Sequence, residues 1–113
     1  MKKILLTLLL LPSLAYAAPD VCAIADARLK EVQHEWSHAG FYRMTPPLQQ
    51  ATSTKGTYRE NLARYFIKES DVYAAWSKSE SHRKNLEATS SAQCLRTVNS
   101  YWVLITWSPY RTI

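Results

Sequence analysis

The sequence predicts an α+β domain in which helices pack on a small antiparallel sheet. Two observations carry this prediction. Apolar residues before residue 87 recur mainly at steps of three and four, which is the spacing of a helix face. Residues 93–107 are instead rich in β-branched and aromatic residues, as strands are. Helices followed by a pair of strands, rather than alternating with strands, favour an antiparallel sheet covered by helices.

The first seventeen residues have the pattern of a secretory signal peptide. Two lysines precede an apolar run at residues 4–11, and the small-x-small sequence AYA follows as a cleavage site. The apolar run is too short to span a bilayer. We therefore expect residues 1–17 to be removed and residues 18–113 to form a single domain. That domain is expected to be secreted or periplasmic, without a transmembrane segment.

The chain has two cysteines, Cys22 and Cys94, which lie near opposite ends of this domain. In an oxidising compartment they are expected to form one disulfide bond. The alternative is that both are metal ligands. The disulfide is the simpler interpretation, because secretion favours it.

The charge of the domain argues against one class of partner. The whole chain has a net charge of +5, and removal of Lys2 and Lys3 with the leader leaves +3. The basic side chains are scattered and form no stripe, so we do not expect a nucleic-acid-binding protein. Nothing in the sequence fixes the oligomeric state.

The first helix is predicted over residues 19–39. Its apolar stripe consists of Val21, Ala25, Leu29, Val32, Trp36 and Ala39. Asp20 is placed to cap the start of the helix, and Gly40 stands where a helix commonly ends.

The sequence HEWSH, residues 34–38, falls inside this predicted helix. On a helix, H-E-x-x-H places two imidazoles one turn apart, as in one class of zinc peptidases. In that interpretation His34 and His38 bind zinc, Glu35 is the general base and Glu60 is the third ligand. The alternative is that these residues form the solvated polar face of the helix.

The middle of the chain is predicted to contain a break, a loop and a second helix. Two prolines interrupt regular structure at residues 45–47. The following residues 49–56 are polar and rich in Ser and Thr, which indicates a loop. Residues 58–66 return to helical spacing and are predicted to form a helix.

The last part of the chain is predicted to contain a third helix and a hairpin. Ser70 is expected to cap a helix that runs to about Ser79 and continues irregularly to Leu86. Residues 93–98 and 101–107 are expected to be two strands joined by a turn at Asn99-Ser100. Since both faces of the second strand are apolar, we expect it to be central and covered on both sides.

The aromatic residues are expected to serve two purposes. The four tryptophans are assigned to the core, because a small domain needs large buried side chains. Three tyrosines, Tyr42, Tyr65 and Tyr110, are candidates to line an apolar groove.

Three segments occur in the order of one known family. They are RENLA at 59–63, AWSKSESHRKNL at 75–86 and YWVLITW at 101–107. They resemble the GENLA, AWxxSPGHRxN[IL] and YYWVQVF segments of the CAP superfamily. That superfamily contains the cysteine-rich secretory, antigen 5 and pathogenesis-related proteins and a bacterial SCP-like branch. The resemblance covers about half of the chain and implies a shortened CAP-like α-β-α sandwich.

The resemblance also implies where a site should lie. Members of this family have a central cleft lined by His and Glu, which in some members bind a divalent metal. By motif position, Glu60 and His82 are the cleft residues of this chain. Met44 stands where an earlier cleft histidine is expected, and His38 is the candidate substitute for it.

The function expected from this resemblance is that of a binding module. Its cleft, with Glu60 and His82, would take a small apolar ligand such as a lipid, a divalent metal such as zinc, or a protein partner. The alternative function is a zinc-dependent metallopeptidase that uses the HEWSH sequence. The sequence alone does not decide whether the protein is an enzyme.

Overall fold

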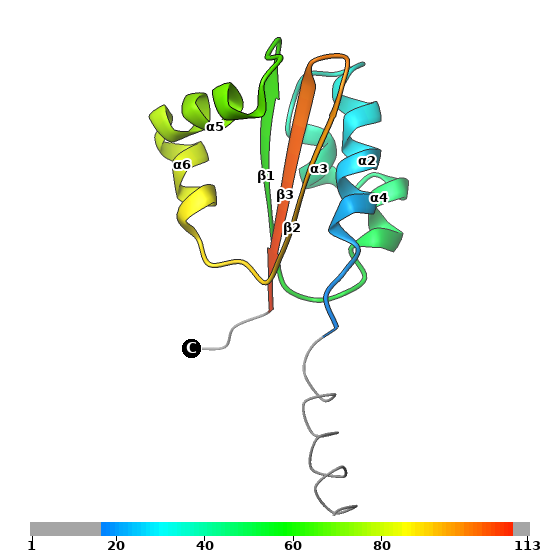
Figure 1. Cartoon of the computed structure of the whole chain (residues 1–113). Helices are drawn as coiled ribbons and strands as arrows, with labels where there is room; N and C mark the ends of the chain where they lie inside the picture. The colour runs from blue at the N-terminus through cyan, green and yellow to red at the C-terminus, as the bar shows by residue number, and fades with distance from the viewer. Residues whose placement is uncertain (1–16, 110–113) are drawn as a thin grey trace, which may run out of the picture.

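Residues 17–109, which the computed structural model describes, form three layers with a sheet in the middle (Figure 1). One face of the sheet is covered by α2 (Val21–Val32), α3 (Ala39–Arg43) and α4 (Pro46–Ala51), and the other by α5 (Glu69–Lys78) and α6 (Glu80–Glu87). The strands are β1 (Thr57–Arg64), β2 (Ala92–Val98) and β3 (Tyr101–Ser108). The predicted α+β class, with helices packed on a small antiparallel sheet, is confirmed.

Two predictions fall outside the described residues. The proposed signal peptide lies there apart from its last residue, and so does Tyr110. Within residues 17–109, the helices are all too short or too polar to cross a membrane.

The sheet has the strand order β1-β3-β2, and both pairings are antiparallel. The hairpin β2–β3 turns at Asn99 and Ser100, whose φ angles are +52° and +64°. Two consecutive positive φ angles are typical of the type I′ turn that suits the twist of a hairpin. Both the predicted hairpin and the central position of its second strand are confirmed.

Side chains of β3 enter two separate parts of the core. Val103, Ile105 and Trp107 pack against α2 and α4 on one face, whereas Trp102 and Leu104 pack against α5 on the other. Because successive side chains of a strand alternate between faces, a strand covered on both sides is largely apolar. Trp76, Trp102 and Trp107 are buried, as predicted for core residues, and Trp36 is partly buried.

The first helix is shorter than predicted. Asp20 caps it as expected, with Oδ1 accepting from the backbone N–H of Ala23 at 3.0 Å. The helix ends at Val32, however, and residues 33–38 form a loop before α3. The prediction that Gly40 ends the helix is wrong, because Gly40 lies inside α3, close against the Arg28 side chain. Within this loop, the carbonyl oxygen of Ser37 accepts from Arg28.

The predicted helix over residues 58–66 is wrong, because residues 57–64 form the strand β1. Leu62 and Ala63 suggested helical spacing, but they face opposite covered sides of the sheet: Leu62 packs in the core with α2 and Ala63 in the core with α5. Pairing with β3, about forty residues later in the chain, decides the structure of this segment. Local spacing cannot report such a distant partner.

The predicted third helix is present as two helices. The helix α5 begins at Glu69 rather than after Ser70, and Lys68 occupies the cap position without a side-chain hydrogen bond. Ser79 is extended, with φ −104° and ψ 124°, and separates α5 from α6. This change of direction allows α6 to lie along β1.

The predicted disulfide is confirmed. Cys22 in α2 is bonded to Cys94 in β2, and their Cα atoms are 5.2 Å apart. The bond ties the first layer of helices to an outer strand of the sheet. The alternative role of the two cysteines as metal ligands is therefore ruled out for this disulfide-bonded form.

Candidate functional site

The site is built around a buried ion pair between α2 and β1. Arg28 and Glu60 have side chains that are each 1% exposed. Glu60 Oε2 accepts from Arg28 Nε at 2.5 Å, and Glu60 Oε1 accepts from Arg28 Nη2 at 3.1 Å. A guanidinium that donates to both oxygens fixes the position of the carboxylate as well as its charge.

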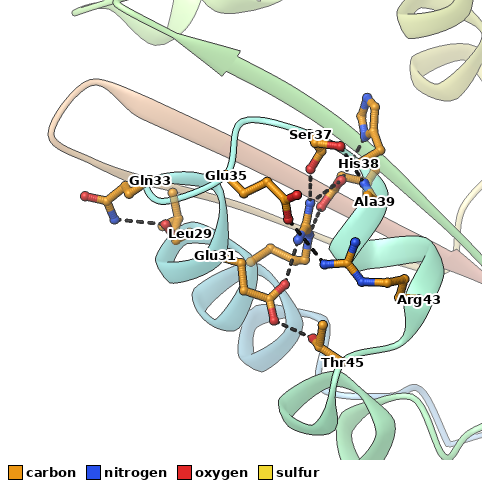
Figure 2. A network of polar contacts seen from close by, with 11 residues as sticks. Leu29, Glu31, Gln33, Glu35, Ser37, His38, Ala39, Arg43 and Thr45 are labelled. Carbon is orange, nitrogen blue, oxygen red and sulfur yellow. Dashed lines mark hydrogen bonds and ion pairs between the residues drawn. The ribbon is translucent and has the colours of Figure 1, made fainter.

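The remaining N–H groups of Arg28 bind Ser37, in the loop of residues 33–38, and Glu31 of α2. Arg28 Nη2 donates to the carbonyl oxygen of Ser37 at 2.8 Å, and Nη1 donates to Glu31 Oε1 at 2.6 Å. Glu31 in turn accepts from the hydroxyl of Thr45, and Figure 2 shows these side chains gathered at the end of α2. Burial lowers the pKa of Arg28, but its bonds to Glu60 and Glu31 outweigh burial and raise the pKa above its ordinary value. The guanidinium is therefore always charged.

The ion pair also positions the ring of His38. Its Nδ1 lies 2.8 Å from Glu60 Oε1. A carboxylate held by Arg28 is an acceptor, so His38 Nδ1 donates to it. In the neutral imidazole, the unprotonated nitrogen is then Nε2, which is free to accept a hydrogen bond or to bind a metal. The ion pair therefore fixes both the tautomer and the direction of this ring.

A small cavity lies at the outer edge of β1. Its volume is about 210 Å³, and it is lined by Trp36, Ser37, His38, Leu62 and His82. His38 comes from the loop on one face of the sheet and His82 comes from α6 on the other face. The two layers can meet here because β1 is an outer strand, with no neighbour on this side among the described strands.

Two asparagines hold His82 and α6 against β1. Asn61 is buried, and its Nδ2 donates to the carbonyl oxygen of His82 at 3.1 Å. Asn85 Nδ2 donates to Asn61 Oδ1 at 2.8 Å and to the carbonyl oxygen of Glu60 at 3.3 Å. Successive residues of β1 thus have separate tasks: Glu60 holds His38, Asn61 holds the backbone of His82, and Leu62 lines the cavity between them.

The structure separates the two residues that the family resemblance placed in one cleft. His82 lines the cavity, whereas the carboxylate of Glu60 is buried behind His38. His38, the candidate substitute named from the sequence, lines the cavity and bonds to Glu60. Tyr42 and Tyr65 are exposed and are not among the residues that line the cavity.

The HEWSH sequence lacks the geometry that its chemistry requires. Residues 34–38 are not helical, which corrects the prediction. His34 is exposed, and Glu35 is exposed and paired with Arg43 at 3.2 Å. The expected third ligand, Glu60, binds Arg28 through both of its oxygens. Within residues 17–109, no three His, Cys, Asp or Glu side chains are grouped so that they could hold a metal ion.

Sequence reasoning missed the residues that position the site. Arg28, Asn61 and Asn85 were not singled out, although each bonds to Glu60 or to the backbone of His82. Arg28 carried a detectable signal, because it lies on the buried face of α2 beside Ile24 and Leu29. A charged residue on such a face needs a buried partner.

We expect His82 to titrate below its ordinary pKa. Burial lowers the pKa of His82 below 6.5, and the charge of His38 lowers it further. The unfolded chain then binds more protons, so the stability contributed by neutral His82 is complete above about pH 6.5 and is lost as the pH falls through the folded-state value. An NMR titration of the ring protons measures this shift. His38→Ala should raise the pKa of His82, whereas His34→Ala should leave it unchanged.

The fold and the site together define a small, disulfide-linked α-β-α domain with two histidines at one cavity. A comparison with models of protein families, with curated proteins and with solved structures found no match to this chain. Its function therefore has to be argued from the site and from the sequence.

Proposed function

We propose that this protein is a secreted or periplasmic binding module that takes a small ligand with an apolar body into the cavity between His38 and His82. The observation that carries the proposal is the lining of the cavity. Trp36 and Leu62 supply apolar surface, and two imidazoles supply polar contacts. A mostly apolar cavity with a few fixed polar groups is the usual form of a small-molecule site. The signal-peptide pattern and the disulfide support an oxidising location.

We further propose that the domain is a shortened CAP/SCP-like domain. The three similar segments support this assignment, as does the order of its layers. In this chain the motif position of Glu60 serves to hold a histidine rather than to face the cavity directly.

Binding is favoured over catalysis by the contacts inside the site. Ser37 provides the hydroxyl of the cavity, and its Oγ accepts from the backbone N–H of Ala39 at 2.9 Å. Among residues 17–109, no hydrogen bond joins this hydroxyl to either imidazole. Ser37 is therefore not paired with His38 or His82 as a nucleophile with its base. Glu60 is committed to Arg28 and His38.

A divalent metal such as zinc is the second candidate ligand. It is favoured by one observation, the bond from His38 to Glu60 that leaves Nε2 as a possible ligand. A carboxylate behind a metal-binding histidine is a common arrangement. With His82, the cavity offers two nitrogen ligands, and water would have to complete the coordination.

The proposal is tested by an NMR titration of the mature, disulfide-bonded protein with small apolar probes and, separately, with zinc. We expect the signals of Leu62 and His82 to shift on binding. His82→Ala should weaken binding at least about tenfold, since it removes one wall of the cavity. His34→Ala is the matched control, because it removes an exposed histidine that does not line the cavity. Equal weakening by both variants would contradict the proposal.

A further inference from the structure

Arg64, the last residue of β1, is held between aromatic rings. Its Cζ atom lies 4.6 Å from the ring centre of Trp36 and 4.9 Å from that of Tyr65. Tyr101 packs edge-on against both rings, with centroid distances of 5.7 Å to Trp36 and 6.4 Å to Tyr65. Stacking on aromatic rings engages the faces of a guanidinium and leaves the N–H groups at its edge available.

The charge of Arg64 has no carboxylate partner in the described part of the chain. Within residues 17–109, the side-chain hydrogen bonds and ion pairs of arginine are made by Arg28, Arg43, Arg83 and Arg96. Arg64 is thus oriented by its neighbours but is not neutralised by them. A charged group held in place without a counter-charge is prepared to bind an anion, because little freedom is lost on binding.

Arg64 lies next to the cavity. Leu62 lines the cavity, and Arg64 is the next residue on the same face of β1, about 7 Å further along the strand. Trp36 connects the cavity with Arg64, since its ring lines the cavity and also stacks on the guanidinium. Arg64 is not among the residues that line the cavity, but its contact with Trp36 places a fixed positive charge next to it.

The backbone beside Arg64 is strained in a way that presents an aromatic ring to solvent. Tyr65 has a φ angle of +74° and is 73% exposed. Its N–H donates to the carbonyl oxygen of Ser100 at 2.7 Å, which holds this conformation. A bulky residue at positive φ is rare, and such strain is found mainly where a site requires it. Here the strain places the second ring against Arg64.

Two other basic groups near the cavity offer less positive charge than Arg64. Arg28 is paired with Glu60 and Glu31. Burial lowers the pKa of His82, which favours its neutral form. Arg64 accordingly offers a permanent positive charge beside the cavity.

We propose that Arg64 binds the carboxylate of the ligand, and that the ligand is a small monocarboxylic acid with an apolar body. The apolar body would lie against Trp36 and Leu62, and the carboxylate would accept from two N–H groups of Arg64. This inference rests on the proposed function, since it assigns the class of ligand to the same cavity. A single guanidinium fork matches the two oxygens of a carboxylate.

The test compares acids with their neutral amides. The mature, ¹⁵N-labelled protein is titrated by NMR with hexanoate, hexanamide, phenylacetate and phenylacetamide. We expect each acid to bind at least about tenfold more tightly than its amide. Binding should shift the NMR signals of Leu62, His82 and the Nε–H of Arg64. Arg64→Gln should remove this preference, and Arg64→Lys should restore only part of it, because lysine lacks the planar fork. Arg96→Gln is the matched control, since it removes an equal charge from a surface pair with Asp26.

Each contrary result has a distinct meaning. If acid and amide bind equally and both shift the signals of Leu62 and His82, the role of Arg64 is wrong while the proposed function stands. If none of the four probes shifts these signals, both are wrong. A preference for acids that survives in Arg64→Gln, or that is lost equally in Arg96→Gln, would overturn the assignment to Arg64. Tighter binding of hexyl phosphate than of hexanoate would overturn the assignment of a carboxylate.

Discussion

Replacing Glu60 by alanine is expected to lower the free energy of unfolding by about 3–5 kcal/mol. The substitution leaves the guanidinium of Arg28 buried without its main counter-charge, and Arg28 cannot escape by losing its proton. The loss comes mostly from this uncompensated charge, rather than from the intrinsic strength of the pair. Urea denaturation of the mature protein at pH 7 measures the change.

Two further variants separate this explanation from a general effect of substitution. Glu35→Ala breaks an ion pair with Arg43 whose side chains are more than half exposed, so its cost should stay below about 1 kcal/mol. The double variant Arg28→Met, Glu60→Leu removes both charges and should regain much of the stability lost in Glu60→Ala. A cost below about 1 kcal/mol for Glu60→Ala would show that Arg28 finds solvent or another partner.

The parts of the fold that depend on local chemistry were predictable from the sequence. The hairpin follows from two β-rich runs around Asn99-Ser100, where Asn99 accepts a positive φ with little strain. The cap at Asp20 is likewise a short-range interaction. Prediction of the disulfide required only the number of cysteines and the expected oxidising compartment.

The errors fall where distant contacts decide the structure. Residues 57–64 form a strand paired with β3, and residues 33–38 form a loop in which the carbonyl oxygen of Ser37 accepts from Arg28. Periodicity describes which residues are apolar, but it does not identify the element that covers them. The zinc-site interpretation of HEWSH required residues 34–38 to be helical, and in the structure they are not.

The candidate site was only partly predictable for a related reason. Motif position drew attention to Glu60 and His82, but it could not show that His38 would lie between Glu60 and the cavity. That arrangement depends on the path of the α2–α3 loop. Arg28 sets this path through one guanidinium that binds Glu60 and Ser37 together. The stability of the domain and the shape of its cavity therefore depend on the same buried group.

Removal of the disulfide is expected to lower the free energy of unfolding by about 4 kcal/mol. Cys22 and Cys94 are 72 residues apart, and in the chain-entropy model a loop of this length restricts the unfolded chain by about that amount. This is a large fraction of the stability usual for a domain of this size. Urea denaturation with and without reductant measures the effect. The double variant Cys22→Ser, Cys94→Ser is the control, since reductant should not change its stability.

The disulfide should also affect the cavity, because Arg28 follows Cys22 by six residues on α2, about 9 Å along the helix axis. In native conditions, reduction frees the start of α2 from β2 and loosens the position of Arg28 relative to Glu60. His38 is held by that carboxylate, so its ring should become less fixed. We then expect the pKa of His82 to move from its lowered value towards 6.5, as water enters the cavity. An unchanged His82 titration in reduced but folded protein would show that β1 alone maintains the site.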